Sequence, residues 1–204
     1  MNQVLKILVI VITSYILGSI PSSYIMGRLI KGIDLRNHGS GNLGAANTFR
    51  VLGARAAVPV LLIDIGKGFL AVKLISFLSM EHFVYYLIAA LVVIIGHNFS
   101  MFVNFSGGKG VGTTTGALVG LAPLAVGICF IIWLVILLIF RIVSVASIIS
   151  TSMLPVMIFV TNRFLGGTTH ISIIYLSIFT ALMVIYKHRS NIKRLMDGKE
   201  GKLF

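Results

Sequence analysis

The sequence predicts an all-α integral membrane protein with about seven transmembrane helices, some of them short, and with glycine-rich cytoplasmic loops. Composition is the first observation behind this prediction. Of the 204 residues, 57% are hydrophobic and only 11% are charged, whereas soluble domains contain about 25% charged residues. The second observation is a series of long apolar runs, and the third is the uneven distribution of basic residues among the segments that connect them.

Six apolar runs approach the length of about 20 residues that a helix needs to cross the hydrocarbon core of a bilayer. They are Val4–Leu29, Ala56–Ser79, Phe83–Val103, Val111–Phe140, Ile142–Val160 and Ile171–Tyr186. The first run is too long for the core of a signal peptide and has no small-residue cleavage site, so we expect one retained transmembrane helix. The fourth run contains Pro123, and it forms either one tilted helix or two shorter helices joined near Ala122–Pro123.

Basic side chains concentrate in two segments, the loop after the first run and the C-terminal tail. These segments hold 11 of the 17 lysines and arginines, and such segments stay on the cytoplasmic side. The turn Met80–His82 has no lysine or arginine and fits the outside, whereas the loop around Lys109 fits the inside. Since the loop after the first run is inside, the N-terminus is expected outside, and the basic tail places the C-terminus inside. The number of crossings must then be odd, so we expect the Pro123 run to be split, which turns six runs into seven helices. We expect residues 1–204 to form a single transmembrane domain in the plasma (inner) membrane of a bacterium.

The net charge of +12 has two explanations in a membrane protein, the cytoplasmic bias of basic loops and the attraction of anionic substrates and membrane lipids. We therefore expect no nucleic-acid partner. Cys129 is the only cysteine, which excludes a disulfide within the chain and a thiolate metal cluster. The five acidic residues are too few to indicate a carboxylate metal site, so we expect neither a metal nor a cofactor.

The first unusual segment runs from Arg36 to Arg50 and combines several glycines with serine and asparagine. Glycine lets backbone N–H groups approach an anion closely, and an arginine can bind a phosphate through two hydrogen bonds. A flexible loop with turn residues is the alternative, but a plain turn rarely concentrates so many of these residues. The lysine and the strand of a Walker loop are missing. The segment predicts a phosphate site, whose candidate ligands are Gly39, Ser40, Gly41, Asn42 and Arg50.

The second segment, Phe105–Thr113, is a glycine-rich loop that leads into an apolar run. The N-terminus of a helix after such a loop binds anions through its free N–H groups and its dipole, and Lys109 adds a full positive charge. The alternative is a re-entrant turn whose lysine reaches toward the lipid headgroups. We favour an anion site with Gly107, Gly108 and Lys109 as its ligands.

The third segment is the basic tail from His188 to Glu200. His188 and Asn191 are three residues apart and share a face if the segment is helical. By itself, this segment favours a solvated basic helix that touches anionic lipids.

Weaker signals lie inside the apolar runs. Asp64 and Lys67 are three residues apart, and ionisable groups at membrane depth usually pair, so we expect a structural ion pair. Ser144 and Ser147 share a helical face, where serines either pack helices closely or contact a substrate. For His97 we expect a structural role.

Taken together and in this order, the motifs resemble the acyl-phosphate-dependent glycerol-3-phosphate acyltransferases of bacteria, the PlsY family, over nearly the whole chain. The matching pieces are Gly18–Ser23, Gly39–Gly44 with Asn47 and Arg50, Asp64–Gly68, Gly96–His97, Gly107–Val111, Ser144–Ser147, and His188–Asn191 with Glu200. Three positions depart from the family pattern. Ser100 stands where proline is frequent, Ser106 where a basic residue is frequent, and Gly112 where alanine is usual. Loss of the basic residue is expected to weaken phosphate affinity but leaves Lys109 in place.

The resemblance implies transfer of an acyl group from acyl phosphate to the 1-hydroxyl of sn-glycerol 3-phosphate, the first step of phospholipid synthesis. The products are lysophosphatidic acid and phosphate. We assign catalytic roles to Ser40, Lys109, His188 and Asn191, and substrate binding to Gly39, Gly41, Asn42, Arg50, Gly107, Gly108, Ser147 and Glu200. Acyl phosphate has a good leaving group, so positioning can replace a strong enzymatic nucleophile. The proton is expected to pass to the substrate's own phosphate or to His188.

A small membrane transporter of an organic phosphate is the alternative, since glycine loops also build anion sites in carriers. Against it, the sequence shows no inverted repeat, and the motifs lie at one surface of the membrane. The predicted partners are acyl phosphate, sn-glycerol 3-phosphate and membrane lipids. Coenzyme A and acyl carrier protein are not expected as donors, because few residues lie outside the bilayer to dock them.

Overall fold

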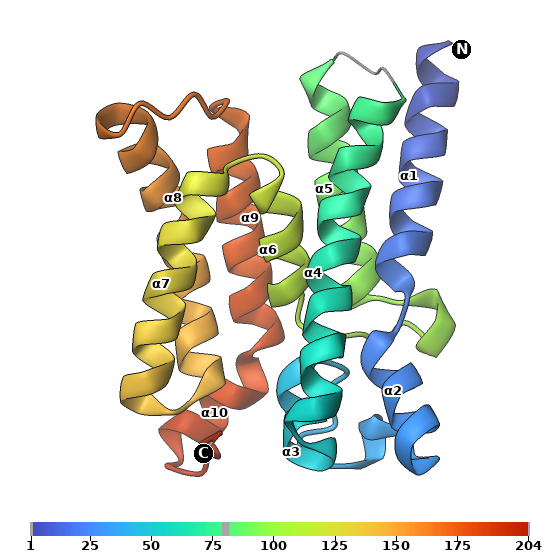
Figure 1. Ribbon diagram of the computed structural model, residues 1–204, viewed down its shortest axis with the longest axis vertical. Helices are drawn as coiled ribbons and strands as arrows, with labels where there is room; N and C mark the ends of the chain where they lie inside the picture. The colour runs from blue at the N-terminus through green and yellow to red at the C-terminus, as the bar shows by residue number, and fades with distance from the viewer. Residues whose placement is uncertain (1, 79–81, 204) are drawn as a thin grey trace. The chain divides into compact units, whose positions relative to one another are not determined.

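The computed structural model describes residues 2–78 and 82–203, and the regular elements in these residues are all helical (Figure 1). This confirms the predicted all-α class. Within the described residues, four helical stretches are long and apolar enough to cross a bilayer, and one shorter apolar helix follows them. The four are Gln3–Lys31, Phe83–Val103, Pro123–Phe140 and Val143–Phe164, and the shorter helix is Ser172–Lys187. The count of seven crossings stays a prediction, and Met80 and Glu81 of the predicted outer turn lie outside the described residues.

The chain divides between Gly120 and Leu121 into two compact units, each of which is described by itself. The prediction of a single domain over residues 1–204 stays a prediction. The N-terminal unit contains α1 (Gln3–Ser19), α2 (Ser22–Lys31), α3 (Ala45–Leu52), α4 (Ala54–Phe77), α5 (Phe83–Asn98), α6 (Val111–Val119) and the short 3-10 helices η1 (Leu35–Asn37) and η2 (Met101–Val103). Helix α5 packs along α1, and α4 packs against α6, α3 and α5. Helices α2 and α3 lie at the end of this unit opposite to the N-terminus (Figure 1).

The first apolar run is not one helix, as predicted, but two. Helix α1 ends at Ser19 and α2 begins at Ser22, because Pro21 has no N–H to donate and its ring disfavours a continuous helix. The carbonyls at the break receive side-chain donors instead: Lys67 Nζ donates to Ile20 at 2.9 Å, and the Ser100 hydroxyl donates to Ser19. A break in an apolar span is tolerated where neighbouring groups satisfy the freed backbone in this way.

Small residues bring α4 and α6 into backbone contact. A Cβ at Gly68 of α4 would collide with the Thr113 carbonyl, and a Cβ at Gly116 of α6 would collide with the Ile65 carbonyl. Glycines at such positions let two apolar helices approach closely. The start of α6, which follows the predicted anion-binding loop, is therefore fixed against α4.

The C-terminal unit contains α7 (Pro123–Phe140), α8 (Val143–Phe164), α9 (Ser172–Lys187) and α10 (Arg189–Met196). Helix α8 packs against α7 and α9, and α10 contacts α9. The predicted split of the fourth apolar run is confirmed, because α6 ends at Val119 and α7 begins at Pro123. Proline suits the first position of a helix, where its missing N–H has no partner to lose.

Large apolar side chains remain exposed on the outer faces of both units. Val4 of α1 is 67% exposed, Leu62 of α4 is 62% exposed and Ile139 of α7 is 68% exposed. Soluble monomers rarely expose contiguous apolar surface on this scale. These faces fit contact with lipid, in agreement with the composition.

Candidate active site

The first glycine loop, His38–Gly44, is held in place by one buried amide. Gly39 and Gly41 have φ of +60° and +71°, in the left-handed region that favours glycine. The Oδ1 atom of Asn47 on α3 accepts the Ser40 N–H at 2.8 Å, and its Nδ2 donates to the carbonyls of Leu35 at 3.1 Å and His38 at 3.0 Å. The sequence grouped Asn47 with the polar residues of a phosphate loop. The structure shows that its side chain braces the loop.

The predicted phosphate ligands of this loop are more exposed than Asn47, the residue that braces it. Ser40 is exposed, Asn42 is half-buried, and Arg50 is exposed in the last turn of α3. The floor of the loop is apolar, because Leu35, Leu43 and Val103 form a buried cluster. This cluster ties the loop to η2, which leads into the second glycine-rich segment.

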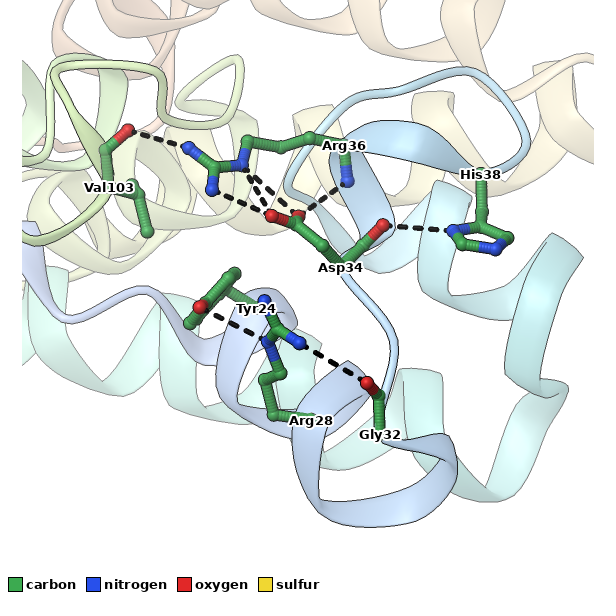
Figure 2. A network of polar contacts seen from close by, with 7 residues as sticks. All are labelled: Tyr24, Arg28, Gly32, Asp34, Arg36, His38 and Val103. Carbon is green, nitrogen blue, oxygen red and sulfur yellow. Dashed lines mark hydrogen bonds and ion pairs between the residues drawn. The ribbon is translucent and has the colours of Figure 1, made fainter.

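A second fastening of the first glycine loop was not predicted from the sequence; we call it the Arg36 clamp, formed by Tyr24, Asp34, Arg36 and the Val103 carbonyl (Figure 2). Arg36 Nη2 lies 2.7 Å from Asp34 Oδ2, and its Nη1 donates to the Val103 carbonyl at 3.2 Å. The guanidinium carbon of Arg36 lies 5.5 Å from the centre of the Tyr24 ring, and that of Arg28 lies 5.2 Å from it. The short Asp-Leu-Arg spacing was the available signal, but Val103 lies far along the chain.

The charges of the clamp reinforce each other. The hydrogen bond from Arg36 holds the pKa of the Asp34 carboxyl below its ordinary value, and the same bond raises the pKa of Arg36. Both groups therefore remain ionised at neutral pH, and the clamp links η1 to η2 through an ion pair.

The second glycine-rich segment, which we call the lysine loop, comprises Asn104–Gly110. The N–H of Gly107 donates to the Asn98 carbonyl at 3.3 Å, and the N–H of Gly108 donates to the His97 carbonyl at 3.1 Å. A Cβ at Gly107 would collide with the His97 carbonyl, and a Cβ at Gly108 would collide with the His97 ring. Glycine is required here because the loop passes directly over the end of α5.

The two glycine-rich loops lie next to each other. A Cβ at Gly108 would come within 2.6 Å of the Leu43 carbonyl, which belongs to the first glycine loop. A small cavity opens beside this contact, and it is lined by Ile20, Pro21, Ser22, Leu43, His97, Ser100, Gly107 and Gly108. The structure thus brings together two segments that are more than sixty residues apart in the chain.

Lys109 is half-buried and lies immediately before the N-terminus of α6. Gly110 has φ of +83° and serves as the N-cap, and its carbonyl accepts the N–H of Thr114 at 2.7 Å. The unpaired N–H groups of a first helical turn favour anions. The predicted combination of a lysine, a glycine loop and a helix N-terminus is therefore present.

The expected ion pair between Asp64 and Lys67 is confirmed, with Nζ 3.0 Å from Oδ1. Ser22 Oγ donates to the same oxygen at 2.7 Å. His97, for which no partner was predicted, places Nδ1 3.5 Å from this oxygen. Because its partners lie on α2 and α5, the Asp64 side chain joins three helices of the N-terminal unit.

In the C-terminal unit, Glu200 is the centre of a hydrogen-bond group that also contains Ser144, Asn191 and Arg194. Its Oε1 accepts from Asn191 Nδ2 at 2.6 Å and from Ser144 Oγ at 3.0 Å, and its Oε2 accepts from Arg194 Nε at 2.7 Å. Burial opposes ionisation, but the hydrogen bonds from Asn191, Arg194 and Ser144 outweigh it and hold the pKa of Glu200 below its ordinary value. The tail is thereby fastened to the start of α8.

His188 lies at the junction of α9 and α10 and is buried. Its Nδ1 lies 2.8 Å from the Val184 carbonyl. A carbonyl only accepts hydrogen bonds, so Nδ1 is the donor in this contact. Further along α8, Ser147 Oγ accepts the indole N–H of Trp133 at 3.2 Å, a contact that the sequence did not indicate.

Comparisons with known proteins extend these observations. The family model described as glycerol-3-phosphate acyltransferase matches residues 8–198. The glycerol-3-phosphate acyltransferase of Halalkalibacterium halodurans is 43% identical over 95% of this chain and 94% of its own length. That of Chlorobaculum tepidum is 39% identical over 98% of this chain and 97% of its own length.

Two solved structures are similar in fold and sequence. The crystal structure of PlsY, an integral membrane glycerol 3-phosphate acyltransferase, in its glycerol 3-phosphate form has a TM-score of 0.86 and 37% identity, and the match covers 96% of this chain and 94% of that chain. The lysophosphatidic acid form of PlsY has a TM-score of 0.83 and 35% identity over the same shares of the two chains.

Proposed function

This chain belongs to the glycerol-3-phosphate acyltransferase family, and from this membership we propose the donor, the acceptor position and the residues of its reaction. It is a membrane acyltransferase. The acyl group passes from acyl phosphate to the 1-hydroxyl of sn-glycerol 3-phosphate, and the products are lysophosphatidic acid and inorganic phosphate. The transporter alternative is not favoured, because the relatives are acyltransferases.

The observation that carries this proposal is the contact between the two glycine-rich loops, where Gly108 approaches the carbonyl of Leu43. Two phosphorylated substrates require two anion sites close together, and adjacent loops can supply them. We assign binding to the backbone and side chains of Gly39, Ser40, Gly41, Asn42, Gly107 and Gly108. Arg50 and Lys109 neutralise the charge that these sites gather.

The chemical step needs little help from a nucleophile. The 1-hydroxyl oxygen bonds to the acyl carbonyl carbon, the bond from that carbon to the phosphate oxygen breaks, and phosphate leaves with the bonding electrons. The hydroxyl proton goes either to a substrate phosphate or to His188. The hydrogen bond of His188 Nδ1 to Val184 supports His188 as an acceptor, because a neutral ring that donates from Nδ1 has its lone pair on Nε2.

In the C-terminal unit, we assign Asn191 and Ser147 to contact with the substrate and Glu200 to the support of Asn191. An ionised Glu200 would repel a phosphate, and its carboxylate accepts three hydrogen bonds, so we assign it to orienting Asn191 and not to binding substrate. Asn191 then acts as a hydrogen-bond donor in the reaction. Ser147 accepts from Trp133, which leaves its own O–H to donate to a substrate oxygen.

The donor is tested with purified protein, glycerol 3-phosphate and three donors of matched chain length: acyl phosphate, acyl-coenzyme A and acyl carrier protein. Lysophosphatidic acid is measured by mass spectrometry. Only acyl phosphate should react, because its head is a single phosphate and its tail can remain among apolar helices at about 0.8 kcal/mol per buried CH₂. Comparable rates with acyl-coenzyme A would disprove the proposed donor.

The site is tested with Lys109→Ala, Arg50→Ala and Ser40→Ala. Each should lower kcat/KM by about 10²-fold, or roughly 2.7 kcal/mol. Arg55→Ala is the matched control, since Arg55 is exposed at the start of α4 and lies outside both loops. Activity within a few-fold of wild type in all three variants would remove the site assignment.

We also propose a bacterial plasma membrane location with the N-terminus outside and the C-terminus inside. The basic loops support this orientation. In a Cys129→Ser background, single cysteines at Asn2 and Lys202 should react with a membrane-impermeant thiol reagent from opposite sides. Labelling of both from one side would contradict the odd number of crossings.

A further inference from the structure

Four buried polar side chains meet beside the lysine loop: Ser22 from α2, Asp64 and Lys67 from α4, and His97 from α5. All three partners approach Asp64 Oδ1, with Ser22 Oγ at 2.7 Å, Lys67 Nζ at 3.0 Å and His97 Nδ1 at 3.5 Å. A buried carboxylate is costly unless its partners neutralise it and satisfy its lone pairs. The proposed reaction uses none of these four residues.

The helix break explains Lys67 but not His97. Lys67 Nζ donates to the Ile20 carbonyl at 2.9 Å, a group that the break before Pro21 leaves without a helical partner. Lys67 therefore satisfies both the carboxylate and the freed backbone. His97 lies in the last turn of α5. Its imidazole contacts a different segment.

That segment is the lysine loop. The His97 carbonyl accepts the Gly108 N–H at 3.1 Å, and the ring lies so close that a Cβ at Gly108 would collide with Nε2. The imidazole is thus placed with Nδ1 toward Asp64 and Nε2 against Gly108. The next residue in the chain is Lys109.

His97 lines a small cavity together with Ser22, Gly107 and Gly108. On the other side of the ring, the Asp64 carboxylate lies 3.5 Å from Nδ1. A carboxylate attracts an N–H at this nitrogen, so it favours the tautomer that carries the proton on Nδ1 and helps to orient the ring.

We propose that His97 is a positioning residue for the lysine loop. Asp64 orients the imidazole, the imidazole fixes the path of the backbone at Gly108, and this path places Lys109 at the phosphate. The inference rests on the proposed phosphate-binding role of Lys109. It requires that His97 acts on the reaction only through the loop, so that its removal matters only while Lys109 is present.

A double-mutant cycle measures this coupling. In the wild-type background, His97→Ala should lower kcat/KM by about 30-fold, and in the Lys109→Ala background by less than about threefold. Equal losses in the two backgrounds would overturn the inference while the role of Lys109 stands. Wild-type activity in Lys109→Ala would instead overturn the proposed function, and the inference with it.

A second variant separates positioning from structural support. His97→Asn keeps an N–H donor at the place of Nδ1 but is too short to reach Gly108. It should therefore restore the thermal stability lost in His97→Ala without restoring kcat/KM, and the cycle is repeated with it. Restoration of both would assign His97 a purely structural role. His82→Ala is the matched control, because His82 is exposed at the other end of α5, and it should leave both quantities unchanged.

Discussion

The first glycine loop and the C-terminal tail are fastened in opposite ways. Asn47 holds the loop with a neutral amide that makes three hydrogen bonds to backbone groups. Glu200 holds the tail with a carboxylate that accepts from Ser144, Asn191 and Arg194. A neutral brace adds no negative charge to a loop that we propose to bind phosphate. A charged brace is tolerated in the tail because three donors surround it.

The two braces should differ in their response to acid. An amide does not titrate, so the contribution of Asn47 to stability is independent of pH. The ordinary pKa of Glu200 is 4.5 and its pKa in the folded protein is lower. The stabilisation from Glu200 is therefore fully present above about pH 4.5 and is lost as the pH falls through the lower, folded value.

The largest effect is expected for a glycine of the lysine loop, which neither Asn47 nor Glu200 holds. Gly108→Ala places a Cβ against the His97 ring and the Leu43 carbonyl, so the lysine loop must move away from the first glycine loop. We expect kcat/KM to fall by about 10³-fold, roughly 4 kcal/mol. Gly127→Ala in α7 is the control, because apart from its chain neighbours and its own helix backbone nothing lies within 4 Å of the added Cβ. A Gly108→Ala enzyme with near wild-type turnover would show that the contact of the loops is not needed.

The neutral brace is tested next. Asn47→Ala leaves the Ser40 N–H and two carbonyls without their partner, which should cost about 2–3 kcal/mol of stability and about 10²-fold in kcat/KM. Asn162→Ala is the matched control. Asn162 makes the same kind of amide bonds, at 2.7 and 3.0 Å, to the backbone of Thr169, and its loop lies at the end of the C-terminal unit opposite to α10 (Figure 1).

The control should lose stability and keep its activity, whereas Asn47→Ala should lose both. Equal kinetic losses in the two variants would mean that any weakened loop lowers turnover, and that the first glycine loop has no special place in the reaction.

Local sequence was sufficient for the fold class and for the position of the loops. Apolar length, basic asymmetry and clusters of glycine are properties of short segments, and the split at Pro123 follows from proline chemistry at a helix start. The break at Pro21 had the same kind of signal. It was not predicted because the apolar run continues on both sides of the proline, and its length by itself fits one spanning helix, whereas the missing N–H of Pro21 breaks it.

The braces could not be predicted because their contacts exist only after the loop, the helix or the tail has folded back on itself. Asn47 belongs to the glycine-rich motif, but its role as a brace is visible only once α3 packs against the loop and brings its amide to Ser40, Leu35 and His38. The pairing of Asp64 with Lys67 followed from a spacing of three, but nothing in the sequence brings His97 to the same oxygen. Glu200 belongs to the matched tail motif, yet only the contact with Ser144 shows that its carboxylate is enclosed.

The charged brace should give a smaller effect than the neutral one. Glu200→Gln keeps an oxygen for Asn191 and Ser144 but turns an N–H donor toward Arg194, so we expect a loss of about 1–2 kcal/mol and about tenfold in kcat/KM. Trp133, the only tryptophan, lies in the same unit and reports its unfolding by fluorescence.

The same measurement across pH sharpens the comparison. The wild-type C-terminal unit should lose stability below about pH 4.5, and Glu200→Gln should lose less over that range because the titrating group is gone. An unchanged acid profile in Glu200→Gln would show that another group controls the acid response of the tail.

The smallest effect is expected for Asp34→Asn, which separates the charge of a brace from its location. Asp34 is a charged brace beside the neutral one, because the Arg36 clamp fastens the same loop that Asn47 holds. Its loss should be mild, since Arg36 still donates to Val103 at 3.2 Å and still stacks on Tyr24. The pair is also partly exposed, with side chains 28% and 12% accessible, and water screens such pairs. We therefore expect a loss of about 0.5–1 kcal/mol of stability and a change of a few-fold in kcat/KM.

The pKa of Asp34 is lowered from 3.8, so its contribution to stability is present above about pH 3.8 and disappears as the pH falls through the folded value. Asp197→Asn, at an exposed position after α10, is the control and should change neither stability nor rate. If Asp34→Asn instead lowered kcat/KM as much as Asn47→Ala, the location of a brace and not its charge would decide how strongly it supports the reaction.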